Sequence, residues 1–192
     1  MQPRLNVSDL ACLRGDRLLF SRLSFGLQPG EALQVVGANG TGKSSLLRIL
    51  AGLLRPFEGV VERSGPAALL DHHLPLDEQL PLGRALDLYR DMIGGCGPAQ
   101  RAVLGLTELR DVPVRYLSAG QRKRTAFLLS NPDSAPLWLL DEPLNGLDTA
   151  WAELLLKEFE AYRANGGMIL VASHQPFPLK DLRTLDLAEY AP

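Results

Sequence analysis

The sequence is poor in cysteine, histidine and aromatic residues, with two Cys, three His and 6% Phe, Trp and Tyr in 192 residues. The two cysteines, Cys12 and Cys96, are too few and too far apart for a disulfide framework or a close-spaced metal motif. We therefore expect both to be small buried apolar residues in a protein of a reducing compartment.

Long apolar runs and an excess of one charge are also missing. No stretch offers the roughly 18 apolar residues that a membrane span needs, and the N-terminus lacks the apolar core of a signal peptide. The formal net charge is −2, from 20 basic and 22 acidic residues. Nucleic-acid binding proteins usually carry a basic excess, so we expect no nucleic-acid partner and no membrane span.

What remains is the composition of a globular protein, 46% hydrophobic and 22% charged. A chain of this length buries about 70% of its unfolded surface, enough for one domain with its own core. Strands are expected at 5–10, 17–27, 32–36, 137–140 and 168–172. Helices are expected at 43–51, 84–93, 99–106, 119–129 and 149–164. The whole of 65–114 is interpreted as short helices. Alternating strands and helices predict an α/β core with a small helical insertion.

A glycine-rich loop lies between the strand at 32–36 and the helix at 43–51. It fits G-x-x-x-x-G-K-[ST] at every fixed position, and its residues are Gly37, Ala38, Asn39, Gly40, Thr41, Gly42, Lys43 and Ser44. Such a loop turns its backbone N–H groups and the helix N-terminus toward an anion, and Lys43 would reach the β- and γ-phosphates. The alternative is a chance glycine-rich turn, but the flanking strand and helix favour a nucleoside triphosphate site.

A second motif is the apolar run Leu137–Leu140 followed by Asp141 and Glu142. The end of a buried strand places Asp141 beside the phosphate loop, where it would hold Mg²⁺ together with the Ser44 hydroxyl. Glu142 would orient or deprotonate the attacking water. Alone, an apolar run followed by Asp-Glu often marks only a strand ending at a solvated turn, and the phosphate loop is what makes the motif informative.

A third motif, Leu-Ser-Ala-Gly-Gln at 117–121, opens a helix with capping-box spacing between Ser118 and Gln121. Considered alone, it favours a well-capped helix whose basic residues, 122–124, face solvent. Asp148 and His174 follow it along the chain.

This order of motifs resembles the ATP-binding subunits of ABC transporters, over about residues 5–188. More narrowly, the Leu-Ser-Ala-Gly-Gln motif, Pro136–Pro143 and Ser173–Pro176 resemble the ATP-binding subunits of the haem exporters of cytochrome c maturation. The resemblance implies one ABC ATPase domain with a P-loop NTPase core, about 1–70 and 131–192. It also implies an N-terminal antiparallel β-subdomain and an α-helical subdomain at about 71–130.

The resemblance further implies a head-to-tail homodimer with two ATP molecules at its interface. Each ATP would lie between one copy's phosphate loop, including Ser45, and the partner copy's Ser118, Ala119, Gly120, Gln121 and Asp148. Lys43, Glu142 and His174 would be the catalytic residues. The partners would be integral membrane permease subunits of a haem exporter, with this chain peripheral on the cytoplasmic side of the bacterial inner membrane.

The sequence departs from the family pattern at three positions. His73 stands where a magnesium-contacting glutamine is usual, and Arg14 stands where an aromatic residue usually stacks on adenine. A guanidinium plane can also stack on a base. Ala119 replaces a commoner glycine, as expected in the cytochrome c maturation branch.

Three alternative hypotheses remain open. The His72–His73 pair invites a haem-ligand hypothesis, against which stands its place in the loop that senses nucleotide. The chain could instead be the ATPase of a lipid, peptide or drug exporter, which co-purification with an unrelated permease would show. A soluble ABC-type ATPase acting on ribosomes or DNA would be stimulated by nucleic acid without any membrane protein.

Overall fold

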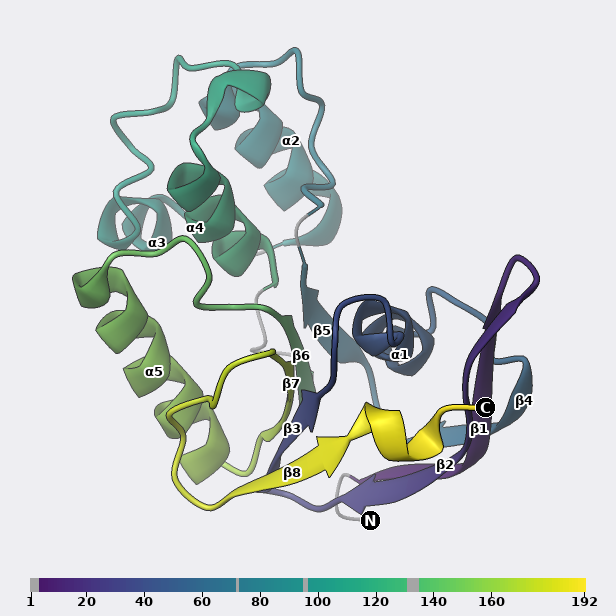
Figure 1. The fold of residues 1–192 in the computed structure, drawn as a ribbon. Coiled ribbons are helices and arrows are strands. Elements are labelled where there is room, and N and C mark those ends of the chain that lie inside the picture. Colours follow the sequence, from purple (N-terminus) through teal and green to yellow (C-terminus); the bar gives the residue numbers. More distant parts are fainter. Residues whose placement is uncertain (1–3, 72, 95–96, 131–134) are drawn as a thin grey trace. The chain divides into compact units, whose positions relative to one another are not determined.

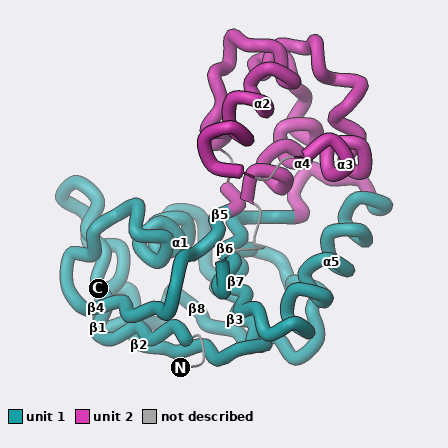
Figure 2. Tube along the Cα trace, turned by 180° about the vertical axis from the view of Figure 1, so that it is seen from behind, with its two compact units in different colours: residues 1–69, 132–143, 149–192 teal, residues 70–131, 144–148 magenta. Residues whose placement is uncertain are grey.

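The computed structural model describes residues 4–71, 73–94, 97–130 and 135–192, so the expectations for His72 and Cys96 lie outside the described residues. The chain divides into two compact units (Figure 2). Unit 1 comprises residues 1–69, 132–143 and 149–192, and unit 2 comprises residues 70–131 and 144–148.

Unit 1 contains an antiparallel sheet of three strands in the order β2-β1-β4 (Figure 1). The strands are β1 (Leu5–Arg14), β2 (Arg17–Leu27) and β4 (Glu58–Arg63). Strands β1 and β2 pair from Leu5↔Leu27 to Arg14↔Arg17 around a turn at Gly15-Asp16, in which Gly15 has a φ of 59°. The strands expected at 5–10 and 17–27 are therefore confirmed, and the first extends further than expected.

The second sheet of unit 1 has five strands in the order β5-β6-β7-β3-β8. These strands are β3 (Ala32–Val36), β5 (Ala67–Leu70), β6 (Leu137–Asp141), β7 (Met168–Ala172) and β8 (Leu182–Asp186). β3 pairs in parallel with β7 and β8, and β6 pairs in parallel with β7. The carboxyl ends of these parallel strands therefore share one edge, where α/β sheets bind their ligands.

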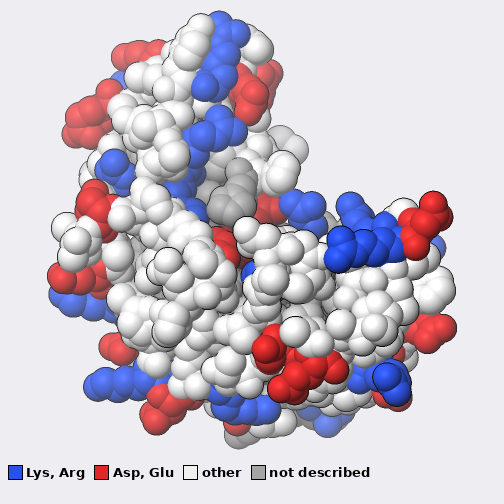
Figure 3. Space-filling view, in the orientation of Figure 1, with Lys and Arg blue, Asp and Glu red and all other residues white. Residues whose placement is uncertain are grey.

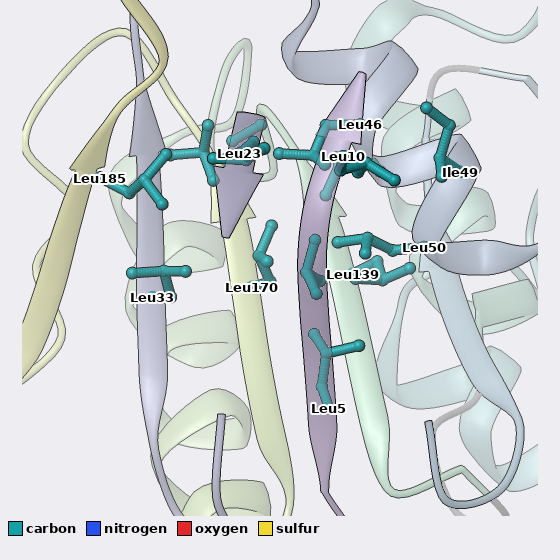
Figure 4. Packing of buried hydrophobic residues seen from close by; sticks show 14 of the residues in the cluster. Leu5, Leu10, Leu23, Leu33, Leu46, Ile49, Leu50, Leu139, Leu170 and Leu185 are labelled. Atoms are coloured by element: carbon teal, nitrogen blue, oxygen red, sulfur yellow. The ribbon is translucent and has the colours of Figure 1, made fainter. Parts of the chain in front are cut away.

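Two helices pack against this sheet, α1 (Lys43–Ala51) against β6 and β7 and α5 (Thr149–Ala164) against β7. Alternate residues of each strand point to opposite faces. On one face Leu33, Leu139 and Leu170 join a buried cluster with α1 and the antiparallel sheet (Figure 4). On β6, Trp138 instead makes edge-to-face contacts with Phe159 and Tyr162 of α5, at centroid distances of 5.0 and 5.3 Å. Both faces are buried, so the predicted α/β fold is confirmed.

Unit 2 is mainly helical, as predicted for this part of the chain. Its elements are α2 (Leu82–Ile93), α3 (Pro98–Val103), the 3₁₀ turn η1 (Val114–Tyr116) and α4 (Ala119–Ser130). A second 3₁₀ turn, η3 (Leu187–Tyr190), follows β8 in unit 1.

The interpretation of 65–114 as helices alone is wrong at its start, because Ala67–Leu70 forms strand β5. Within it Ala68 and Leu70 are buried and their neighbours are half-buried, the alternation of a strand. Four residues are too few for periodicity to separate a strand from a helix.

The prediction that Cys12 is a buried apolar residue is confirmed, since it is 1% exposed and burial raises the pKa of its thiol. Among the helices of the described ranges, none has the length and apolarity to cross a membrane.

Candidate functional site

The phosphate loop links the carboxyl end of β3 to the first turn of α1, as the motif predicted. Gly37, Gly40 and Gly42 have φ angles of 146°, 81° and 109°, which side-chain-bearing residues rarely adopt. Gly42 also lies against the antiparallel sheet, because a Cβ there would come within 3.0 Å of a ring carbon of Phe20. The backbone of the loop therefore adopts conformations that favour glycine, as in loops whose amides bind anions.

Lys43, the first residue of α1, curls back over this loop. Its Nζ donates to the carbonyls of Gly37 and Ala38 at 2.7 and 3.1 Å, and the residue is 8% exposed. A charge in such low-dielectric surroundings acts strongly on an anion bound in the same loop. Ser44 is exposed on the next position of the helix, and Ser45 lies beside Cys12.

Asp141 and Glu142 stand at the carboxyl end of β6, where the sequence placed them. Asp141 is 5% exposed and pairs in the ladder with Ala172 of β7. Glu142 has a φ of 46°, and its N–H donates to the Ala172 carbonyl at 2.9 Å. A left-handed non-glycine residue costs about 1–2 kcal/mol, and such strain clusters at functional sites. The sharp turn at Glu142 ends the strand beside the end of β7.

The same turn brings Glu142 to His174, which follows β7. Nδ1 of His174 lies 2.9 Å from Oε1 of Glu142, and the His174 N–H donates to the same oxygen at 3.2 Å. The Glu142 side chain is 14% exposed and that of His174 is 46% exposed. A carboxylate held in this way, with its neighbour open to solvent, can accept a proton from a water molecule.

A polar residue that the motifs missed lies under this segment. Gln34 is 4% exposed in the middle of β3 and hydrogen-bonds to the backbone of Gln175 and Phe177. The available signal was a single glutamine inside a strand expected to be buried on both faces.

In unit 2, the predicted capping box at the start of α4 is confirmed. The Ser118 N–H donates to Oε1 of Gln121 at 2.8 Å, and the Gln121 N–H donates to Oγ of Ser118 at 3.3 Å. Ser118 and Ala119 are exposed, while Gly120 and Gln121 are half-buried. This exposed N-terminus carries the positive end of the helix dipole.

The alternative of a solvated basic face on α4 is wrong. Lys123 is 7% exposed and its Nζ donates to the Asn145 carbonyl at 3.3 Å, while Arg122 pairs with Glu78 at 2.9 Å. The basic side chains pack against their own unit because the helix buries this side. The contact with Asn145 joins α4, at whose start the motif lies, to the segment 144–148, whose last residue, Asp148, is exposed.

Two of the three residues that depart from the family pattern, His73 and Arg14, lie in different units. His73 is in unit 2, with a 79% exposed side chain, and its N–H donates to Oδ1 of Asp71 at 2.8 Å. Arg14 is in unit 1, exposed at the end of β1 beside the hairpin turn. Their roles toward magnesium and adenine stay predictions.

Ser44 and Asp141 supply a hydroxyl and a carboxylate, the oxygen ligands that Mg²⁺ prefers. Within the described ranges there is no group of three or more His, Cys, Asp or Glu residues that could hold a metal ion. Two protein oxygens suit a magnesium ion that takes its other ligands from phosphates and water, as in nucleotide sites.

Charged residues of both signs are interspersed over the visible surface of each unit (Figure 3). The charges that the site uses, on Lys43 and Asp141, are buried instead.

Comparisons with known proteins show the family of this chain. Residues 20–81 match the ABC transporter family model. The chain is 54% identical to the cytochrome c biogenesis ATP-binding export protein CcmA of Novosphingobium aromaticivorans, over 98% of this chain and 97% of the relative. The CcmA protein of Zymomonas mobilis is 48% identical, over 97% and 86%. An ABC transporter solved in an inward-facing conformation superposes with a TM-score of 0.71 at 26% identity, over 92% of this chain and 75% of that one.

These similarities, together with the phosphate loop and the carboxylates at the end of β6, confirm the predicted P-loop NTPase fold of an ABC ATPase that binds ATP. The chain belongs to the family of cytochrome c biogenesis ATP-binding export proteins, a branch of the ABC transporter ATPases.

Proposed function

We propose that this chain is the ATP-hydrolysing subunit of an ABC transporter complex for cytochrome c biogenesis. Hydrolysis would drive export of haem or its release from a chaperone. The observation that carries the hydrolytic role is the Glu142–His174 pair at the edge of the sheet that also bears the phosphate loop. The cytochrome c role is supported by relatives that match nearly the whole chain.

The phosphate loop binds the triphosphate of ATP. Its amides and the N-terminus of α1 surround the phosphates, and Lys43 exchanges its contacts with Gly37 and Ala38 for β- and γ-phosphate oxygens. The binding residues are Gly37, Ala38, Asn39, Gly40, Thr41, Gly42, Lys43, Ser44 and Ser45, with Arg14 against the adenine. Ser44 and Asp141 hold Mg²⁺, which would neutralise charge on the transferring phosphoryl group. His73 is a third candidate for the magnesium site.

Hydrolysis uses the pair at the ends of β6 and β7. Glu142 accepts a proton from the attacking water as the new O–P bond forms and the bond from the γ-phosphorus to the bridging oxygen breaks, releasing ADP and phosphate. His174 holds the carboxylate through its Nδ1 contact and directs its other ring nitrogen toward the γ-phosphate or the water. Lys43 stabilises the negative charge on the phosphoryl oxygens.

Two copies complete the ATP sites. Ser118, Ala119, Gly120, Gln121 and Asp148 of one copy contact the ATP bound by the other, in a head-to-tail homodimer with twofold symmetry. The capped, exposed N-terminus of α4 is suited to a phosphate because its dipole favours negative charge. Both units together then form a single ABC ATPase domain.

The complex also contains integral membrane permease subunits of a haem exporter, and this chain is peripheral on the cytoplasmic side of the bacterial inner membrane. ATP-driven closure of the dimer and its opening after hydrolysis shift the permease between two states. Neither the lipid, peptide or drug exporter nor the soluble ATPase is favoured by the relatives.

The test is a pull-down of the tagged full chain from solubilised membranes, with the bound subunits identified. We expect permease subunits of the cytochrome c system, and a host with Glu142→Gln in place of the parental chain should lack mature c-type cytochromes. Recovery of an unrelated permease, with normal c-type cytochromes in that host, would contradict the proposal.

A further inference from the structure

Gln34 is a buried polar residue in an otherwise apolar strand. β3 reads Ala-Leu-Gln-Val-Val, and Gln34 is 4% exposed. Its neighbours Leu33 and Val35 belong to the buried cluster with α1. Since side chains alternate along a strand, Gln34 points to the opposite face of the sheet. A buried primary amide is unfavourable unless its polar atoms are bonded, so its partners matter.

Both ends of the Gln34 amide bind the segment that follows β7. Nε2 donates to the carbonyl of Gln175 at 2.6 Å, and Oε1 accepts from the N–H of Phe177 at 3.2 Å. Without this amide the Phe177 N–H would lose its acceptor, and the Gln175 carbonyl would keep its hydrogen bond from Oγ of Ser173. Leaving a buried donor without an acceptor is unfavourable. One side chain thus forms hydrogen bonds with two backbone groups of the irregular segment that follows β7.

The backbone on both sides of His174 is held by hydrogen bonds. On its N-terminal side, the Ser173 N–H donates to the Val35 carbonyl at 3.2 Å, continuing the β3–β7 ladder. On its C-terminal side, Gln175 is held by Gln34, and Oγ of Ser173 also donates to the Gln175 carbonyl at 3.0 Å. The backbone is therefore held on both sides of the residue whose ring meets Glu142.

The far end of the segment is held by packing. Phe177 is 7% exposed, and its ring centre lies 6.0 Å from that of Phe159 on α5. The hydrogen bond from its N–H to Gln34 therefore connects β3 to a point that is already anchored. Loss of Gln34 would remove the link from β3 to Gln175 and Phe177, while the bonds between Ser173 and Gln175 and the packing of Phe177 stay in place.

We propose that Gln34 is a positioning residue for ATP hydrolysis, which sets the backbone of 174–177 so that His174 meets Glu142. The inference rests on the proposed roles of His174 and Glu142. Gln34 then acts on the chemical step and not on the affinity for ATP, because the phosphate loop has its own contacts through Lys43 and α1.

The test is steady-state ATP hydrolysis by the full chain carrying Gln34→Leu, a substitution of similar volume without hydrogen-bonding groups. A small displacement of catalytic groups can cost up to about a hundredfold, and we expect kcat to fall by about ten- to a hundredfold with KM for ATP little changed. Gln28→Leu makes the same substitution at an exposed position of unit 1 and should retain the parental kcat. A parental kcat in Gln34→Leu would overturn the inference. A loss of ATP affinity as large as the loss of kcat would also overturn it.

A double-mutant comparison separates positioning from general structural damage. If Gln34 acts through His174, adding Gln34→Leu to His174→Ala should reduce kcat no further. An equal additional loss in both backgrounds would overturn the inference. Parental hydrolysis by His174→Ala alone would instead overturn the proposed role of His174, and with it the reason for positioning it.

Gln34→Glu tests the same inference through the pH dependence of kcat. This test remains informative if Gln34→Leu folds poorly. A protonated carboxyl can donate to Gln175 and accept from Phe177, whereas an ionised one has no donor. We therefore expect kcat relative to the parental chain to be highest at low pH and to fall as the new carboxyl ionises. A ratio that is constant with pH would overturn the inference.

Discussion

Glu142 and His174 meet at a single oxygen, since both Nδ1 and the backbone N–H of His174 approach Oε1 of Glu142, at 2.9 and 3.2 Å. The two residues follow neighbouring parallel strands, and Asp141↔Ala172 is the last pair of that ladder. The sheet therefore brings both residues to the same edge, and the segment after β7 places His174 against Glu142. This geometry makes the following predictions specific.

Glu142→Gln should retain ATP binding and lose most hydrolysis, by at least about a hundredfold, because an amide of the same shape cannot accept the proton. ATP affinity by titration and phosphate release separate the two effects, and the variant should accumulate as an ATP-bound dimer in size-exclusion chromatography. Glu158→Gln, on the exposed surface of α5, is the matched control. Hydrolysis by Glu142→Gln at the parental rate would exclude Glu142 as the catalytic carboxylate.

Lys43→Ala should weaken ATP binding as well as stop turnover, because the phosphate loop loses the ammonium group that lies within it. We expect at least a tenfold rise in the dissociation constant for ATP, measured by calorimetry. Lys157→Ala on exposed α5 should bind ATP like the parental chain. Unchanged affinity in Lys43→Ala would contradict the role given to this lysine.

Gly42→Ala should destabilise the fold more than Gly40→Ala. Both positions have positive φ, 109° and 81°, and each costs about 1 kcal/mol of backbone strain. Only at Gly42 does the added Cβ meet Phe20, at 3.0 Å, whereas at Gly40 nothing lies within 4 Å. The crowding should add about 1–3 kcal/mol to the loss, measured as the free energy of unfolding in urea. Equal losses for the two variants would show that Phe20 gives way without cost.

Tyr162 should ionise at a higher pH than a tyrosine of ordinary pKa. Burial raises its pKa to about 12, and its hydroxyl donates to the Ala135 carbonyl at 2.6 Å. The unfolded chain ionises this phenol near its ordinary pKa of 10, so its contribution to stability is complete below pH 10 and is lost as the pH rises toward 12. Ultraviolet difference titration should show a late component that Tyr162→Phe removes. A late component that persists in this variant would contradict the assignment.

Much of the fold was predictable where periodicity and capping signals agree. Helices α1 and α5 and strand β7 begin and end where the sequence predicted. Strands β4 and β8 were not predicted, because most of their residues are exposed and show little apolar alternation. They form because distant strands, β1 and β3, supply their hydrogen bonds, and such partners leave no local signal.

In the candidate site, too, some residues were predictable from the sequence and others were not. Motif spacing predicted roles for Lys43, Asp141 and Glu142, because phosphate chemistry needs those residue types at fixed places along the chain. Gln34 was missed, since its partners Gln175 and Phe177 are more than a hundred residues away and are backbone groups without a residue signature.

Because Phe20 lies against the phosphate loop at Gly42, we expect ATP binding to be coupled to the folding of the antiparallel sheet. Phe20 belongs to the antiparallel sheet, and it limits the space at Gly42, immediately before α1. A ligand that binds only the folded loop stabilises every part that the loop needs in order to form. ATP should therefore protect the β1–β2 hairpin against unfolding and amide exchange, although Phe20 itself offers no polar atom to a nucleotide. By this thermodynamic linkage, an apolar ring in the neighbouring sheet contributes to ATP affinity.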